Sequence, residues 1–238
     1  DECDFCGHRH PFYNSCRNRH CPQCQGLAQA VWIEQRQQDL LPVEYFHVVS
    51  TIPSELHTLF RLNPATTYGL LFSATSQAIL ELAADPKHLG AQLGLMAVLH
   101  TWTQTLAFHP HLHCVIPGGG PSLDGQRWVS AKPGYFLPTR ALGLLLRGKL
   151  LAALEAGIAD GTLDPGPGTD PRRALKRAAR HRWSVHAKPS FAGPEHVLAY
   201  LGRYTHRIAL SNSRLLAFED GKVTFRYKDR ADDDRTKH

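Results

Sequence analysis

Long apolar runs are missing from the sequence: its 238 residues contain no stretch of 18 consecutive apolar residues, and we expect no signal peptide. Since a helix needs about 20 apolar residues to cross a bilayer, we expect no membrane-spanning segment and no membrane partner. Internal repeats and low-complexity tracts are missing as well. The length therefore predicts one large globular domain or two modest ones.

Cysteine is scarce after residue 24, where only Cys114 remains. It lies alone in an apolar stretch, so we expect a buried small hydrophobic residue there rather than a ligand. The other five cysteines lie in the first 24 residues, where the motifs CDFC and CPQC are separated by 14 residues. Two CxxC motifs at such a spacing are typical of a zinc site with four thiolate ligands. The predicted zinc ligands are Cys3, Cys6, Cys21 and Cys24.

The same N-terminal segment holds further side chains that can bind metal. Cys16 and His20 lie close together in the stretch SCRNRHC and are candidates for a second zinc site. A disulfide framework is the alternative, which is disfavoured because nothing in the sequence indicates secretion. We expect the zinc-binding module to present Arg17 and Arg19 to DNA.

A nucleotide-binding loop is also missing, although GLLLRGK at 143–149 matches the pattern G-x-x-x-x-G-K. Such a loop needs Ser or Thr after the lysine to hold magnesium, and Leu150 stands there. The stretch lies inside an amphipathic helical pattern, with leucines where a phosphate cradle needs exposed amides. We therefore expect a core helix here and no nucleotide cofactor.

The charge is unbalanced in favour of basic residues. The formal net charge is +6 and the isoelectric point about 9.1, while 42% hydrophobic residues are enough for a core. A basic balance favours a polyanionic partner such as nucleic acid. The chain begins almost on the cysteine motifs and ends in the charged stretch DRADDDRTKH. We expect it to be a piece of a longer protein.

Hydrophobic periodicity predicts several helices and strands. The helices are expected at 28–41, 64–85, 139–157 and 194–207. Strands are expected at 45–51, within 94–106, from 109 onward, at 182–187 and in a hairpin at 214–228, with a loop at 118–127 and a linker at 160–171. This mixture predicts an α+β fold with a mainly antiparallel sheet flanked by helices. We expect a zinc-binding module at 1–42 and a second domain at 43–238.

The stretch HPHLHCVIPGGG at 109–120 places histidines at every second position of an expected strand. Successive side chains of a strand point to opposite faces, so His111 and His113 share one face and Leu112 and Cys114 share the other. Two neighbouring imidazoles can bind one metal ion, for which we expect Mg²⁺ or Mn²⁺.

Two imidazoles leave a metal ion under-coordinated, so a third ligand is expected. If AFHP at 107–110 forms the hairpin loop, Gln104 faces His113 on the same side of the sheet. Gln104 is therefore the predicted third ligand. His109 is the alternative, although Pro110 is expected to turn it out of the strand.

The expected helix at 194–207 carries two tyrosines, Tyr200 and Tyr204, four residues apart. Residues at this spacing lie on one face of a helix, one turn from each other. Arg203 and Arg207 form a second pair at the same spacing, which suits phosphate oxygens. The alternative is that the tyrosines only pack on a core.

Taken together, the histidine strand and the tyrosine helix resemble HUH endonucleases with two tyrosines. The whole chain resembles rolling-circle transposases of the insertion sequence 91 family. The matching stretches are SCRNRHCPQCQ, FHVVSTIPSEL, LHTWTQTLAFHPHLHCVIPGGG, YLGRYTHRIALSNSRL and GKVTFRYKD, in family order. The resemblance implies an HUH endonuclease domain after the zinc-binding module, and DNA as the partner, mainly the single-stranded ends of an insertion sequence.

The resemblance also implies a reaction. Tyr200 or Tyr204 attacks a phosphodiester to give a covalent 5′-phosphotyrosine and a free 3′ hydroxyl. A bacterial cytoplasmic, nucleoid-associated location follows from the same resemblance. Two other hypotheses stay open: a zinc-dependent DNA-binding protein without catalysis, and a metal-dependent hydrolase that uses His109, His111 and His113 on a small substrate.

Overall fold

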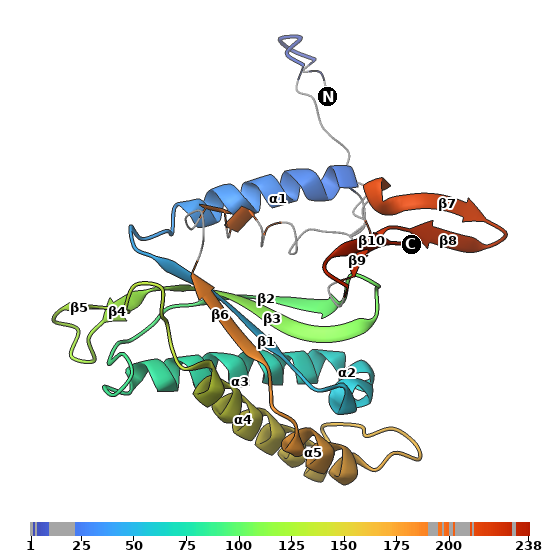
Figure 1. Ribbon diagram of the computed structural model, residues 1–238. Helices are drawn as coiled ribbons and strands as arrows, with labels where there is room; N and C mark the ends of the chain where they lie inside the picture. Colours follow the sequence, from blue (N-terminus) through green and yellow to red (C-terminus); the bar gives the residue numbers. More distant parts are fainter. Residues whose placement is uncertain are drawn as a thin grey trace.

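The computed structural model describes Glu2, residues 4–9 and 22–189, Glu195, His196, Leu198, Ala199, Gly202, Leu210, and residues 212–229 and 232–238. A four-stranded sheet lies at the centre of this part, in the order β2-β3-β1-β6 (Figure 1). Every neighbouring pair in this sheet is antiparallel. The strands are β1 (Tyr45–Thr51), β2 (Met96–Trp102), β3 (Phe108–Pro117) and β6 (Val185–Pro189).

Helices and three small two-stranded sheets surround the central sheet. The helices are α1 (Pro22–Gln37), α2 (His57–Leu62), α3 (Pro64–Ala84), α4 (Thr139–Ala159) and α5 (Pro171–Arg180), with short 3-10 helices at Ser54–Leu56 and Asn212–Arg214. The small sheets pair β4 (Gly119–Pro121) with β5 (Trp128–Ser130), β7 (Leu215–Glu219) with β8 (Lys222–Phe225), and β9 (Tyr227–Asp229) with β10 (Arg235–Lys237). The predicted α+β fold with a mainly antiparallel sheet is confirmed.

One face of the central sheet forms the main core with α3 and α4, which lie together below it in Figure 1. Alternation along β3 points Leu112, Cys114 and Ile116 into this core, where all three are fully buried. Burial raises the pKa of the Cys114 thiol to about 12. Cys114 is thus a small core residue, as its sequence context predicted.

Helix α4 contributes leucines at four-residue spacing to the same core. Leu142, Leu146, Leu150 and Leu154 are at most 2% exposed, so this row faces the sheet side while the opposite side of the helix meets solvent. The stretch GLLLRGK therefore lies in a core helix, as expected from its leucines.

The opposite face of the sheet is covered by α1, which lies above it in Figure 1. Tyr45, Val98 and Val115 form a small buried cluster on this face, against which Trp32 and Leu40 pack. Since His111 and His113 alternate with Leu112, they point to this second face and away from the main core.

The three glycines after β3 allow close backbone contacts. A Cβ atom on Gly118 would lie 2.9 Å from the Glu44 carbonyl oxygen, and one on Gly120 would overlap the Gln92 carbonyl. Only glycine fits such approaches. The glycine run thus permits the close packing of this segment against neighbouring backbone.

Several segments differ from the sequence expectation: the helix expected at 28–41 is α1, which ends at Gln37, and no helix was expected at α2. The expected loop at 118–127 contains β4, which pairs with β5, and the helix α5 follows directly on the expected linker. The Asp170 side chain caps α5 by accepting a hydrogen bond from the Arg173 amide, and Pro171 starts the helix. The hairpin around Asp220 and Gly221 is as predicted, with φ values of 51° and 73° that fit a type I′ turn.

No helix in the described part of the chain is both long and apolar enough to cross a membrane.

Candidate metal centre

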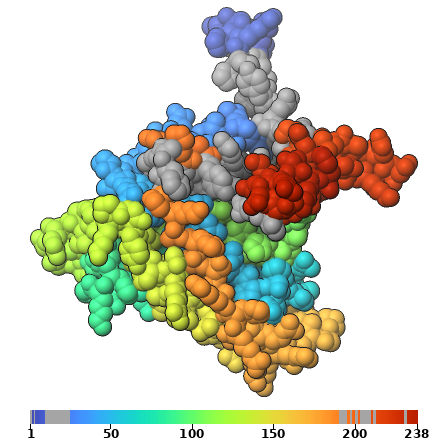
Figure 2. All heavy atoms as spheres, in the orientation of Figure 1, coloured from blue at the N-terminus to red at the C-terminus, as the bar shows by residue number. Residues whose placement is uncertain are grey.

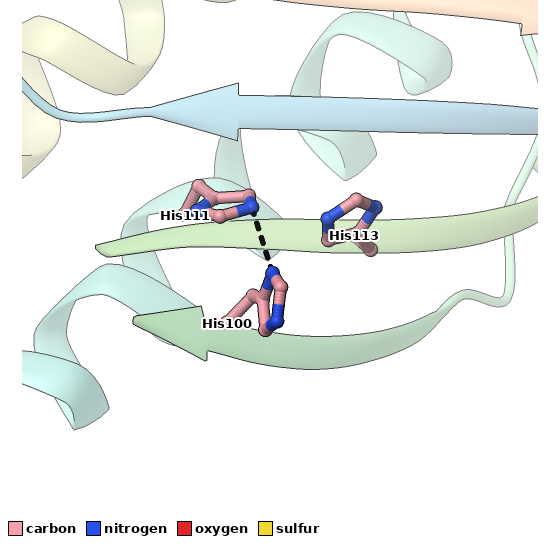
Figure 3. A group of neighbouring side chains, drawn as sticks. All are labelled: His100, His111 and His113. Atoms are coloured by element: carbon pink, nitrogen blue, oxygen red, sulfur yellow. Dashed lines mark hydrogen bonds between the residues drawn. The ribbon is translucent and has the colours of Figure 1, made fainter. Parts of the chain in front are cut away.

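Three histidines from two neighbouring strands come together on the α1 side of the sheet (Figure 3). His111 and His113 come from β3, and His100 comes from β2, where it is paired directly with His111. The three ligand nitrogens lie within 4.8 Å of one another. Imidazole nitrogens lie about 2.0–2.1 Å from a bound zinc ion, so two ligands of one ion are at most about 4.2 Å apart. The spacing of the three imidazoles is thus close to what one ion requires.

Hydrogen bonds orient the rings of this cluster. His111 Nδ1 lies 2.6 Å from the His109 carbonyl oxygen, an acceptor, so Nδ1 carries the proton and Nε2 carries the lone pair. That Nε2 atom faces His100, whose Nδ1 lies 3.2 Å away. A backbone acceptor behind a histidine is the usual way in which a metal ligand is held in its tautomer.

The His47 imidazole on β1 holds the His113 ring in its tautomer, as the His109 carbonyl does for His111. Its Nε2 atom lies 2.8 Å from His113 Nδ1, and the two rings stack with centroids 5.1 Å apart. Burial lowers the pKa of His47, which keeps its imidazole neutral and able to accept the His113 proton. His113 then directs its other nitrogen, Nε2, as a ligand.

The ligand set determines what the centre can do. In the described part of the chain, the group that could hold an ion consists of three imidazoles and no carboxylate. Neutral ligands leave the full charge of a divalent ion available to an anionic substrate. His100 and His113 are 7% and 5% exposed, whereas His111 is only half-buried, so access to the centre is from the His111 side.

The prediction of Gln104 as third ligand rested on a hairpin register that is wrong. Val98 pairs with His113, and Gln104 lies exposed in the turn beyond the end of β2. Its carbonyl oxygen accepts a hydrogen bond of 2.5 Å from Arg214 Nη2. The turn closes between the Thr103 and Ala107 backbones, so it begins four residues before the expected loop at 107–110. The position opposite His113 that sequence reasoning gave to Gln104 is taken by Val98, and the third imidazole comes from His100, opposite His111.

The expectation that Pro110 turns His109 out of the strand is also wrong, because β3 begins at Phe108 and contains both residues. Pro110 lies at a register shift between β2 and β3, just beyond the last pair that β3 makes with β1. A missing backbone donor is tolerated at such a bulge. The His109 ring lies near both the His111 ring, with centroids 5.2 Å apart, and the His57 ring of α2, with centroids 6.2 Å apart, and the three-histidine group does not include it.

Two family models match the chain. One, described as "Putative transposase", matches residues 94–238 and includes β2, β3 and both tyrosines; another, described as "Transposase zinc-binding domain", matches residues 1–52. The chain belongs to this transposase family. The resemblance to the insertion sequence 91 family, with its N-terminal zinc-binding domain, is thereby confirmed.

Two proteins similar to this chain are named as transposases. "Putative transposase y4qJ" of Sinorhizobium fredii (strain NBRC 101917 / NGR234) is 51% identical over 244 residues, which cover 100% of this chain and 61% of that protein. "Transposase for insertion sequence element IS801" of Pseudomonas savastanoi pv. phaseolicola is 29% identical over 235 residues, which cover 94% of this chain and 54% of that protein. The chain thus spans little more than half the length of these relatives.

Among solved structures, the conjugative relaxase TrwC in complex with oriT DNA, in its metal-bound form, is similar with a TM-score of 0.38 and 15% sequence identity. The similarity covers 71% of this chain and 73% of the relaxase chain.

Most of the other predicted site residues of this transposase lie outside the described residues: Tyr200, Tyr204, Arg203, Arg207, Arg17, Arg19, Cys3, Cys16, His20 and Cys21. Cys24 lies in α1, and Cys6 is exposed and forms no disulfide. The zinc ligand set and the two nucleophiles therefore stay predictions.

Gly202 is a described residue of the expected tyrosine helix that contacts α1. Gly202, which lies between the two tyrosines in sequence, is helical and buried. A Cβ atom there would lie 2.7 Å from Ile33 of α1, so the glycine permits close packing on that helix. Because α1 covers the face that carries His111 and His113, Gly202 and the histidines lie on the same side of the sheet.

Proposed function

We propose that this chain is the nuclease part of a transposase that cuts single-stranded DNA at the ends of an insertion sequence. A tyrosine forms a covalent 5′-phosphotyrosine intermediate, and the cut strand is then passed on in rolling-circle transposition. The observation that carries the proposal is the group of three imidazoles within 4.8 Å on the sheet face, in a chain of the transposase family.

The residues that would hold the catalytic ion are His100, His111 and His113, with Mn²⁺ or Mg²⁺ as the ion. A bound divalent ion supplies Lewis-acid stabilisation of the phosphate under attack. Three neutral imidazoles suit Mn²⁺ better than Mg²⁺, which prefers oxygen ligands. The His109 carbonyl and the His47 imidazole hold two of the three rings in the required tautomer.

The nucleophile is the phenol oxygen of Tyr200 or Tyr204. The phenol loses its proton and its oxygen bonds to phosphorus, while the bond from phosphorus to the 3′ oxygen breaks and that oxygen leaves as a hydroxyl. One phosphodiester replaces another, so rejoining needs no nucleotide cofactor. Two tyrosines let one hold the first cut strand while the other makes the second cut. Arg203 and Arg207 would contact neighbouring phosphate oxygens.

The N-terminal module, which we propose to end near residue 42, would bind one structural zinc ion. The ligands would be Cys3, Cys6, Cys21 and Cys24, with Cys16 and His20 as candidates for a second ion. The match of a transposase zinc-binding domain to residues 1–52 supports this proposal. Metal analysis of the reduced chain should give at least one zinc per molecule, and less than one would contradict the proposed ligand set.

The cleavage step is tested with a single-stranded oligonucleotide that contains an element end and is labelled at its 3′ end. The fragment bearing the 5′ phosphate stays on the protein, so the label should move with the denatured chain on a gel when Mn²⁺ is present. Tyr200→Phe combined with Tyr204→Phe should abolish the labelled adduct. Tyr135→Phe, at a tyrosine 53% exposed outside the proposed site, is the matched control and should form it normally.

An adduct that survives in the double Phe variant would refute the assignment of the nucleophiles. No adduct in any variant, with DNA binding intact, would favour a zinc-dependent DNA-binding protein without catalysis. Each single variant should still make a first cut, because the remaining tyrosine reaches the same phosphate. A single variant that completes transposition in the full-length protein would make the other tyrosine structural.

A further inference from the structure

The excess positive charge of the chain is concentrated in one segment, α5 and the two residues after it. Residues 171–182 contain six of the 27 Lys and Arg residues and none of the 21 Asp and Glu residues. The rest of the chain therefore carries 21 charges of each sign, and the net charge of +6 equals the charge of this segment. The six residues are Arg172, Arg173, Lys176, Arg177, Arg180 and Arg182.

Helix α5 separates its basic residues from its buried ones. Leu175 and Ala178 are 9% and 0% exposed and anchor the helix, and the Trp183 indole donates a hydrogen bond of 2.9 Å to the Ala178 carbonyl. Arg173, Lys176 and Arg180 are exposed and lie three and four residues apart, which places them along one stripe of the helix. The fold thus presents this charge to the outside.

A groove beside α5 is also lined by arginines. It has a volume of about 450 Å³, and its walls include Arg140 and Arg147 of α4 together with Arg180 and Arg182. Among the described residues that line it there is no carboxylate. Arg147 is held in place because its Nη1 atom donates a hydrogen bond of 3.0 Å to the Ala179 carbonyl. Guanidinium groups in such numbers suit the oxygens of several phosphates.

We propose that α5 and the adjoining α4 groove, here called the α5 surface, bind the phosphate backbone of double-stranded DNA. This deepens the proposed function and rests on it, because it adds a second DNA segment to the one at the histidines. The α5 surface lies on the far side of the sheet from α1, at the lower edge of the molecule in Figures 1 and 2. It therefore engages DNA separately from the metal centre.

The chemistry of the surface favours a duplex over a single strand. Proteins that hold single strands stack the bases on exposed aromatic rings. The aromatic residue that lines the groove, Trp183, is 5% exposed and donates its N–H to backbone. What the surface offers is charge along a helix about 15 Å long, against a duplex that carries one phosphate charge per about 1.7 Å.

The test compares duplex affinity in a variant of the stripe, Arg173→Gln, Lys176→Gln and Arg180→Gln. The probe is a 25-base-pair duplex of arbitrary sequence, with fluorescence anisotropy measured over a series of salt concentrations. Each lost phosphate contact lowers the slope of log K against log salt by about 0.9, so the triple variant should lose about 2.7 in slope and at least about tenfold in affinity at low salt. Binding of a single-stranded oligonucleotide and of Mn²⁺ should change less than about twofold.

A matched control removes three charges at exposed positions elsewhere: Lys87→Gln, Arg127→Gln and Lys132→Gln. It should retain the wild-type slope. A second variant, Arg173→Lys with Arg180→Lys, keeps the charge and should bind duplex within about threefold of wild type, because phosphate contacts need charge more than shape. Since all of these side chains are exposed, melting temperatures should be unchanged.

The proposal is overturned if the control loses duplex affinity as much as the stripe variant, because the effect is then net charge alone. It is also overturned if single-stranded and duplex affinities fall together, which would make the surface part of one single-strand path. Failure of the proposed function looks different, since the covalent adduct uses the tyrosines and histidines and does not involve the α5 surface.

Discussion

Replacing His100 by Ala tests the composition of the metal centre. His100 is 7% exposed, lies opposite His111 on the neighbouring strand, and packs against the Trp102 ring at 4.3 Å between centroids. The substitution removes one of three imidazoles but keeps the backbone hydrogen bonds that pair β2 with β3. Its effect on folding should therefore be smaller than its effect on metal binding.

The magnitude follows from the ligand count. Loss of a residue that only supports a metal ligand costs about 10- to 100-fold in affinity. Loss of one of three direct ligands should reach at least the upper value, about 100-fold, which corresponds to about 2.7 kcal/mol. We expect Mn²⁺ affinity to fall by at least that factor in His100→Ala. In Gln104→Ala we expect less than a twofold change, because Gln104 is exposed in the turn.

The assay is a titration with Mn²⁺ in which the free ion is measured by electron paramagnetic resonance. The thiolates of the zinc-binding module do not compete, since they prefer softer ions. Urea unfolding of both variants controls for loss of structure. Wild-type affinity in His100→Ala together with weakened binding in Gln104→Ala would refute the three-histidine centre and support a centre with Gln104 instead.

Three further predictions concern the ring support, the core and acid sensitivity. His47→Ala should lower Mn²⁺ affinity by about 10- to 100-fold in the same titration, because His113 loses the partner of its Nδ1 atom. Leu150→Ala, at a fully buried position of α4, should lower the unfolding free energy in urea by about 2–5 kcal/mol. Leu144→Ala on the exposed side of that helix should change it by less than about 0.5 kcal/mol. Burial, and to a lesser degree nearby basic groups, lowers the pKa of His57 in the folded chain. As the pH falls, the unfolded chain therefore binds a proton at His57 at about pH 6.5, before the folded chain does. Thermal stability should therefore fall as the pH drops from 7 toward 5, less steeply in His57→Gln, and equal slopes would contradict this.

The sequence alone predicted the structural features that depend on a local pattern of residues. The alternation of His111 and His113 with Leu112 and Cys114 predicted which side chains share a face, since a strand has a period of two. The row of leucines in α4 identified a core helix for the same kind of reason. The type I′ hairpin followed from Asp220–Gly221, two residues that accept positive φ.

The third ligand could not be predicted in this way, because it depends on the register between two strands. That register is set by a turn with Leu106 at a φ of 63° and by the bulge at Pro110, and neither follows from periodicity. A signal was present nonetheless: His100 is a polar residue in the apolar stretch GLMAVLHTW. A histidine in an apolar strand beside two others is a candidate ligand in every register that puts it on their face of the sheet.

Helix α5 was missed for a different reason. Only Leu175 and Ala178 of its ten residues are buried, so its hydrophobic pattern is too short to detect. Its start signals, Asp170 followed by Pro171, and its run of basic residues are readable in the sequence. They indicate a helix that is rich in basic residues.

The most direct test of the central claim is to identify the residue that carries the nucleotide after cleavage. The chain is incubated with single-stranded DNA that contains an element end and Mn²⁺, the DNA is digested, and the protein is cut with trypsin and analysed by mass spectrometry. Cleavage after Arg203 separates Tyr200, in the peptide 183–203, from Tyr204, in the peptide 204–207. We predict a phosphonucleotide on one or both of these peptides, in wild type and not in His111→Ala. A nucleotide on any other peptide, or its presence on these peptides without the histidine, would contradict the account.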